Sequence, residues 1–168
     1  MKFDFPQVDL PCEILAWNDV TEDILNIYKQ SCRLKAGIFA ICTEGKMTAT
    51  INLIDYEIKP NDLITLLPGT IIQFRERTEK VRLCFAGFSS ECVERINLIK
   101  SMVSSFSKIT ECPIVELQED IASYLIDYFS LLARVTCDEK LSLPSEMTEV
   151  SLRSILTAVG LIYQRDSS

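Results

Sequence analysis

Cysteine is the reactive side chain that this sequence offers most often, but its spacing suits neither catalysis nor metal binding. Histidine is absent from all 168 residues. The chain therefore lacks an imidazole general base, a Ser–His or Cys–His nucleophilic pair and any imidazole metal ligand. A zinc site made of cysteines alone needs paired ligands at short spacing, and no two cysteines form a C-x-x-C pair. We expect neither a metal nor a cofactor.

The cysteines are interpreted as reduced, mostly buried side chains. They are Cys12, Cys32, Cys42, Cys84, Cys92, Cys112 and Cys137. A secreted disulfide framework normally has an even number of cysteines in a shorter chain, whereas a free thiol in an apolar run behaves as a small hydrophobe. The N-terminal residues lack the apolar core of a signal peptide, and no apolar stretch approaches a membrane span. These observations predict a cytoplasmic protein.

Other catalytic signatures are missing or have a simpler interpretation. Ser89 and Ser90 suit the start of a helix, and no G-x-S-x-G turn is present. The sequence has no G-x-G-x-x-G or Walker loop. The carboxylate pairs at residues 22–23 and 119–120 fall on predicted helix surfaces, where solvated acids are common. The sequence therefore predicts a protein that is not an enzyme.

The charge balance argues against nucleic-acid binding by these residues. Lys and Arg number 17 against 24 Asp and Glu, which gives a net charge of −7. Nucleic-acid binders usually present a basic face. One cluster of basic residues exists, but Glu76 and Glu79 interrupt it, and it is typical of a strand–turn–strand with solvated charges. The cluster consists of Arg75, Arg77, Lys80 and Arg82.

Residues 11–88 carry the signals of several short strands. A first strand is predicted between Pro11 and Trp17, followed by a short helix near residues 18–30. From Gly37 the pattern has a period of two, and turn residues recur about every 8–12 residues. No helical pattern separates the later strands, so we expect an all-β sandwich or barrel here.

The inward faces of these strands could line a ligand cavity. Small barrels either enclose one small ligand or fill with side chains, so ordinary core packing remains the alternative for each residue. A shift of one residue in register would turn the opposite set inward. The predicted cavity residues are Phe39, Ile41, Met47, Ala49, Ile51, Phe74, Leu83 and Phe85.

After residue 90 the apolar pattern becomes helical. One helical face runs from Val93 through Ile99 to Phe106, and Cys112-Pro113 interrupts it. From Ile114 the apolar residues recur at steps of three and four, which predicts a heptad seam, and a last helix is predicted over residues 148–164. The seam either packs back on the strands or pairs with a second copy. The predicted dimer-interface residues are Ile114, Leu117, Ile121, Tyr124, Tyr128, Leu131, Leu152, Ile155, Val159 and Ile162.

Strands that precede helices in this way predict an α+β fold, namely a small β-barrel followed by a helical appendix. We place a β-barrel domain in residues 1–90 and a helical dimerisation or linker region in residues 91–168.

Two stretches carry a resemblance to a known family. Residues 37–45, GIFAICTEG, and residues 56–69, YEIKPNDLITLLPG, resemble the cupin-type N-terminal domain of AraC-family transcription regulators. Helices similar to residues 151–165 commonly follow that barrel in the family. The resemblance covers roughly residues 30–165 and rests on patterned rather than invariant motifs.

The resemblance implies a cupin-like barrel that senses a small-molecule effector, helices that form a homodimer, and a separate helix-turn-helix region that binds DNA. The sequence departs from the family pattern in three respects. It contains no helix-turn-helix region, it lacks the histidine ligands of enzymatic cupins, and the turn at residues 52–55 lacks the usual Gly. DNA is therefore expected as a partner only through a domain that is absent from these residues.

Three functions remain open from the sequence. The main hypothesis is the ligand-sensing and dimerisation domain of a bacterial transcription regulator. The alternatives are a metal-free cupin enzyme, such as a sugar isomerase or epimerase, and a purely structural dimerisation module whose barrel is filled by side chains. The sequence names neither the effector nor the regulated genes.

Overall fold

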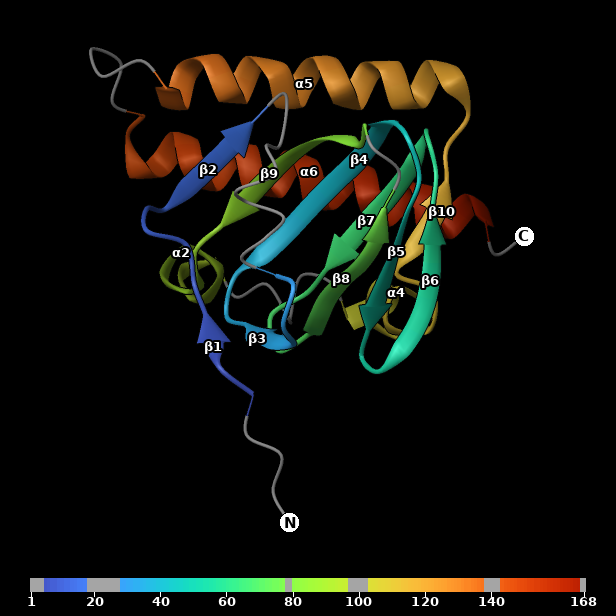
Figure 1. The fold of residues 1–168 in the computed structure, drawn as a ribbon. Helices are drawn as coiled ribbons and strands as arrows, with labels where there is room; N and C mark the ends of the chain where they lie inside the picture. The colour runs from blue at the N-terminus through green and yellow to red at the C-terminus, as the bar shows by residue number, and fades with distance from the viewer. Residues whose placement is uncertain (1–4, 18–27, 78–79, 97–102, 138–142, 167–168) are drawn as a thin grey trace.

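The protein has an α+β fold, with strands first and helices after them (Figure 1). A computed structural model describes residues 5–17, 28–77, 80–96, 103–137 and 143–166. The described strands are β1 (Gln7–Val8), β2 (Ile14–Trp17), β3 (Cys32–Leu34), β4 (Gly37–Glu44), β5 (Met47–Ile51), β6 (Ile54–Ile58), β7 (Asp62–Leu66), β8 (Ile71–Arg77), β9 (Arg82–Phe88) and β10 (Ile114–Glu116). The described helices are α2 (Ser90–Arg95), α4 (Val103–Glu111), α5 (Glu119–Cys137) and α6 (Ser145–Asp166).

The described strands form two five-stranded sheets. The outer sheet has the order β1-β3-β8-β5-β6, and the central sheet has the order β10-β7-β4-β9-β2. All strand pairs are antiparallel except β1 with β3, which is parallel. The part of the chain that the structure describes does not close into the expected barrel.

The turns explain why two sheets form. From β4 onward, the chain crosses from one sheet to the other between β4 and β5, between β6 and β7, between β7 and β8, and between β8 and β9. Gly45 and Gly69 adopt positive φ at the first and third of these crossings, at 82° and 93°. Strands that are neighbours in sequence therefore mostly stack face to face instead of pairing.

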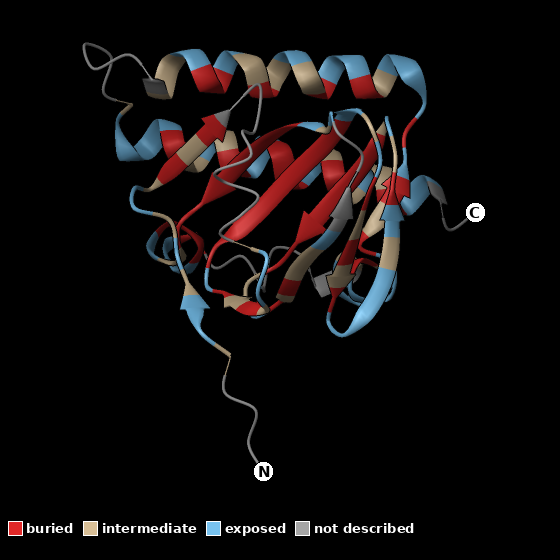
Figure 2. Cartoon of the chain, viewed as in Figure 1, coloured by how far each residue is buried: buried red, intermediate tan, exposed pale blue. Residues whose placement is uncertain are grey.

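Two apolar clusters hold three layers together. The inter-sheet core lies between the sheets, whereas the helix-side core lies between the central sheet and the helices (Figure 2). The central sheet is consequently buried on both faces, and β7 has no exposed residue. The outer sheet is buried on one face only, so β5 alternates between buried and intermediate residues, as its period of two predicts.

The helices pack on the far face of the central sheet. In α5 the buried residues are Ala122, Leu125, Phe129, Leu132 and Ala133, and the first four recur at steps of three and four. Burial of one such large apolar side chain contributes about 1.5–3 kcal/mol to folding. None of the described helices is long and apolar enough to span a membrane.

Several boundaries differ from the sequence-based expectation. Ile114 begins a strand rather than a helix, because β10 pairs with β7 and sets Ile114 opposite Ile64. Of the two serines expected at this helix start, Ser89 caps α2 and accepts a hydrogen bond from the Cys92 N–H. The single helical face expected from Val93 to Phe106 is divided between α2 and α4, and its middle lies outside the described residues. Most of the helix expected near residues 18–30 also lies outside them. The last helix is confirmed and begins at Ser145.

Candidate functional site

A cavity of about 270 Å³ lies between the two sheets. Most of its wall comes from strands of both sheets, and the N-terminal segment covers it. We call residues 5–13 the arm. The lining residues from the strands, the arm and the segment before β3 are Val8, Asp9, Leu10, Pro11, Leu15, Tyr28, Leu34, Ile38, Ala40, Ile64, Leu66, Ile72, Phe74, Leu83 and Phe85.

Strand alternation decides which β4 residues reach this cavity. Ile38 and Ala40 face it, and the register sets them opposite Leu66 and Ile64 of β7. Along the other edge of β4, Phe85 of β9 lies opposite Ala40. Because side chains on a strand alternate between faces, cross-strand partners such as these gather on the same side of the sheet.

The predicted cavity residues fall into three groups in the structure. Phe74, Leu83 and Phe85 line the cavity. Met47, Ala49 and Ile51 belong to the inter-sheet core but do not line it.

Phe39 and Ile41 point to the opposite face of the central sheet. They lie in the helix-side core, where the Phe39 ring meets Phe88 edge-on with centroids 6.3 Å apart. The even-numbered residues of β4 are therefore the ones that face the cavity. The sequence alone could not assign this face, because both faces of β4 are apolar and buried.

Sequence reasoning missed the arm, Tyr28 and seven strand residues of the cavity, namely Leu15, Leu34, Ile38, Ala40, Ile64, Leu66 and Ile72. The arm pairs with β3 through hydrogen bonds from Arg33 N to Pro6 O and from Lys35 N to Val8 O, both 2.8 Å long. Tyr28 packs edge-on against Phe74, with ring centroids 5.6 Å apart. The sequence marks the arm only as an apolar N-terminal segment with prolines, and this segment has no strand periodicity.

The cavity contains little charge. Among the described residues, Asp9 is the only charged residue that lines it. The Asp9 carboxylate accepts hydrogen bonds from Ser90 N (3.1 Å) and Ser90 Oγ at the start of α2. Burial alone raises the pKa of Asp9, but the hydrogen bonds from Ser90 and Leu10 outweigh it and leave the pKa below its ordinary value. Burial raises the pKa of Tyr28, so its phenol stays protonated at neutral pH.

None of the cysteines whose side chains the structure describes lines this cavity. Cys42, Cys84 and Cys92 are buried, and burial raises the pKa of their thiols to about 11, 12 and 11. A thiol with such a pKa holds almost no thiolate at neutral pH, and the thiolate is the nucleophile and the metal ligand. Among the described residues, no group of three or more Cys, Asp or Glu could hold a metal ion.

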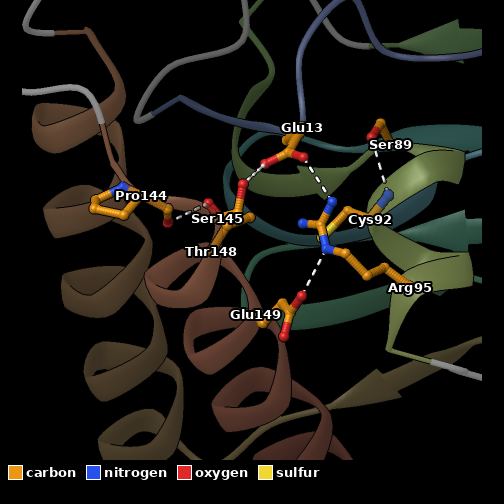
Figure 3. Close-up of polar contacts among 8 residues, drawn as sticks. All are labelled: Glu13, Ser89, Cys92, Arg95, Pro144, Ser145, Thr148 and Glu149. Atoms are coloured by element: carbon orange, nitrogen blue, oxygen red, sulfur yellow. Dashed lines mark hydrogen bonds and ion pairs between the residues drawn. The ribbon is translucent and has the colours of Figure 1, made fainter.

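A polar bridge connects the arm to α2 and to the last described helix, α6 (Figure 3). Arg95, at the end of α2, donates from Nη1 to Glu13 Oε1 (2.7 Å) and from Nε to Glu149 Oε1 (2.6 Å). Ser145 Oγ also donates to Glu13 Oε2 (3.4 Å). The hydrogen bond and charge of Arg95 hold the pKa of Glu13 below its usual range. We call Glu13, Arg95, Ser145 and Glu149 the Arg95 bridge.

The predicted dimer interface is divided between the core and the surface. Leu117, Leu152, Ile155 and Val159 are buried in the helix-side core. Ile121, Tyr128 and Ile162 are partly buried against that core, whereas Ile114 packs against the inter-sheet core.

Tyr124 and Leu131 of the predicted interface lie on the surface of α5. Their exposed fractions are 67 % and 44 %. The predicted seam on α5 therefore runs beside the buried stripe of this helix and not along it.

The basic cluster is partly neutralised by neighbouring acids. Arg75 Nη1 lies 3.6 Å from Asp55 Oδ1, and Arg82 Nε lies 3.5 Å from Glu44 Oε2. Both ion pairs are exposed, as expected for solvated charges on strands.

Comparisons with known proteins give weak structural likenesses only. No protein-family model and no curated protein matches the sequence. Solved structures that match include ToxT from Vibrio cholerae, 10 % identical over 78 % of this chain and 50 % of that chain, with a TM-score of 0.43. An apo variant of ToxT from V. cholerae strain SCE256 is 12 % identical over 93 % of this chain and 55 % of that chain, with a TM-score of 0.46.

The AraC-like transcriptional activator CuxR is also similar. It is 9 % identical over 87 % of this chain and 47 % of that chain, with a TM-score of 0.44. The chain spans about half the length of these solved chains. Likeness at this level assigns no function to the chain.

Proposed function

We propose that these residues form the effector-sensing domain of a transcription regulator and that the arm-covered cavity binds a small, neutral, largely apolar molecule. In this proposal the two stacked sheets are a cupin-like jelly roll. The observation that carries the proposal is the cavity itself, because its apolar walls come from both sheets while its cover is a short segment linked to α2 and α6.

The lining defines the chemical class of the ligand. Nearly every wall residue is aliphatic or aromatic, and transfer of an unpaired charge into such a site costs several kcal/mol or more. Tyr28 supplies a phenol that can donate or accept one hydrogen bond. The smallest ligand pockets measure roughly 300 Å³. A cavity of about 270 Å³ therefore favours a compact ligand.

The arm supplies the route by which occupancy would reach the rest of the protein. Val8, Leu10 and Pro11 touch the cavity, whereas Asp9 binds the start of α2 and Glu13 binds Arg95. Arg95 in turn binds Glu149 of α6, the last described helix. A ligand that favours one arm position therefore also favours one arrangement of the Arg95 bridge, which couples the cavity to α6.

The exposed stripe on α5 is the surface that we assign to dimerisation. An antiparallel pair of α5 helices that sets Tyr124 opposite Leu131 brings Arg134 of each copy next to the acidic helix start, Glu119 and Asp120, of the other. A parallel pair would place like charges together. Opposite charges across an interface favour one orientation over the other.

The cavity chemistry favours sensing over the enzymatic alternative. The titratable lining residues are Asp9 and Tyr28, and the Asp9 carboxylate already binds Ser90. A general acid–base reaction needs a positioned proton donor or acceptor within hydrogen-bond reach of the substrate. The cavity volume also favours sensing over a purely structural module with a filled interior.

Native mass spectrometry combined with thermal unfolding tests the proposal. We expect either a co-purified small mass that disappears on denaturation or stabilisation by 1-decanol but not by glucose or arabinose. Ala40→Leu, which fills the cavity, should abolish this stabilisation, while Thr48→Leu on the outer sheet should retain it. The proposal is wrong if no small mass co-purifies and the apolar probe does not stabilise the wild-type protein, or if Ala40→Leu responds as the wild type does.

A further inference from the structure

A second cavity, of about 170 Å³, lies beside the end of β7. Its walls are the end of β7 with the turn after it, Ile51 and Asn52 at the end of β5, and α4 with Pro113. The residues that decide its chemistry are Thr65, Leu67, Phe106, Ile109, Thr110 and Pro113. It shares no lining residue with the arm-covered cavity.

Thr65 is the unusual residue of this second cavity. Its side chain is 1 % exposed, and its Oγ1 has no hydrogen-bond partner among the described residues. Alternation along β7 places it between Leu63 and Leu67 on the helix-side face, where both leucines join the apolar core. A buried hydroxyl without a partner costs about 1–3 kcal/mol, so most proteins supply one.

The neighbouring polar groups are already engaged with the protein. Thr110 Oγ1 donates to Phe106 O (2.9 Å), and Asn52 Oδ1 accepts from Ile71 N (3.0 Å). The Thr65 backbone N–H donates to Pro113 O (2.9 Å). Thr65 Oγ1 is therefore the fully buried side-chain oxygen of this cavity that lacks a hydrogen-bond partner among the described residues.

We propose that this cavity is a second small-molecule site, whose ligand is a neutral, compact molecule with one hydroxyl or carbonyl group bonded to Thr65 Oγ1. No described Lys, Arg, Asp or Glu lines the cavity, so a charged ligand would lose its hydration without compensation from these residues. A ring of benzene size is the right scale, because an apolar cavity of about 150 Å³ holds benzene. This site does not depend on the proposed function of the arm-covered cavity.

The position of the site allows a bound molecule to restrain the neighbouring helices. Ile109 and Thr110 belong to α4, and Pro113 follows the loop that leaves this helix. The Tyr163 hydroxyl of α6 donates to Cys112 O over 2.6 Å and so holds α6 against the same loop. A molecule bound between β7 and α4 therefore also restrains the loop of Cys112, with which Tyr163 of α6 forms its hydrogen bond.

An NMR titration with phenol and toluene tests this site. The two probes have nearly the same shape, but only phenol can hydrogen-bond with Thr65. We expect amide shifts at Thr65, Gly69 and Thr110, and binding of phenol about tenfold tighter than that of toluene, the factor that corresponds to one hydrogen bond. Thr65→Val should bring the dissociation constant of phenol to that of toluene and leave toluene binding unchanged.

Two further variants make the result specific. Thr110→Phe, at an exposed rim position, should block both probes, whereas Thr48→Val on the outer sheet should preserve the preference for phenol. Equal affinity of phenol and toluene for the wild type would refute the proposal and indicate a water-filled cavity. Shifts confined to Ile38, Leu83 and their neighbours would also refute it, because they would place the probes in the arm-covered cavity.

Discussion

Leu10 of the arm lies so close to Gly87 of β9 that a Cβ on residue 87 would come within 2.7 Å of Leu10 Cδ1. A side chain at residue 87 would force Leu10 Cδ1 to move away from the sheet. This contact and the hydrogen bonds of the arm to β3 hold the cover of the cavity in place.

Gly87→Ala should therefore displace the arm without unfolding the protein. The atom that must move is the end of a flexible side chain, so we expect a loss of stability below about 1 kcal/mol. Hydrogen exchange should show faster exchange of the Arg33 and Lys35 amides, which pair with the arm. The control is Gly160→Ala in α6, where the added Cβ would have ordinary contacts and helix propensity predicts a gain of about 0.5–1 kcal/mol. Unchanged exchange at both amides in Gly87→Ala would contradict the assigned contact.

Acid should weaken the Arg95 bridge. The pKa of Glu13 in the folded protein lies below its ordinary value of 4.5, so the stabilisation is fully present above that pH and is lost as the pH falls through the folded-state pKa. Urea denaturation between about pH 6 and about pH 3 should show a smaller loss of stability in Glu13→Gln than in the wild type. Glu57→Gln, on the exposed face of the outer sheet, is the charge-matched control. Identical pH dependence in all three proteins would show that the bridge does not contribute in solution.

Thr65→Val should stabilise the protein by about 1–2 kcal/mol, because it removes a buried hydroxyl that has no partner within the described part of the chain. Thr148→Val is the matched control. Thr148 is equally buried, at 1 % exposure, but its hydroxyl donates to Pro144 O over 3.4 Å, so its loss should destabilise by up to about 1 kcal/mol. Urea denaturation measures both changes, and destabilisation by Thr65→Val would mean that the hydroxyl has a partner in solution.

Leu53→Gly should stabilise the turn between β5 and β6. Leu53 is 68 % exposed and has a φ of 69°, a conformation that costs a branched side chain about 1 kcal/mol and that glycine adopts freely. Asn61→Gly is the comparison, because Asn61 has a similar φ of 73° but asparagine tolerates this region, so its gain should be only a few tenths of a kcal/mol. Thermal unfolding of the two variants should rank Leu53→Gly above Asn61→Gly. The reverse order would mean that Leu53 makes a contact that offsets its strain.

Leu131→Glu should weaken the proposed dimer at least tenfold, because it places a charge in the apolar stripe of α5. Leu161→Glu on α6 is the control, since Leu161 is 57 % exposed but lies outside that stripe. Light scattering across a concentration series measures both dissociation constants. A wild-type chain that stays monomeric at all concentrations, or equal weakening by the two substitutions, would remove α5 as the interface.

The sequence by itself determined the order of strands and helices and the absence of imidazole chemistry. Strands β4 to β9 lie where alternation and turn residues predicted them, because a period of two and a glycine with positive φ are local properties of the chain. The same holds for α6, whose apolar face recurs at helical spacing.

The tertiary structure decided which faces of those elements are buried against what. Both faces of β4 are apolar, so only the helices packed on one side could show that Ile38 and Ala40, not Phe39 and Ile41, face the arm-covered cavity. Ile114 lies in a strand because β10 pairs with β7. Long-range pairing of this kind overrides a local helical pattern. The Arg95 bridge joins residues that are 54 and 82 positions apart in sequence, a separation that no local pattern can report.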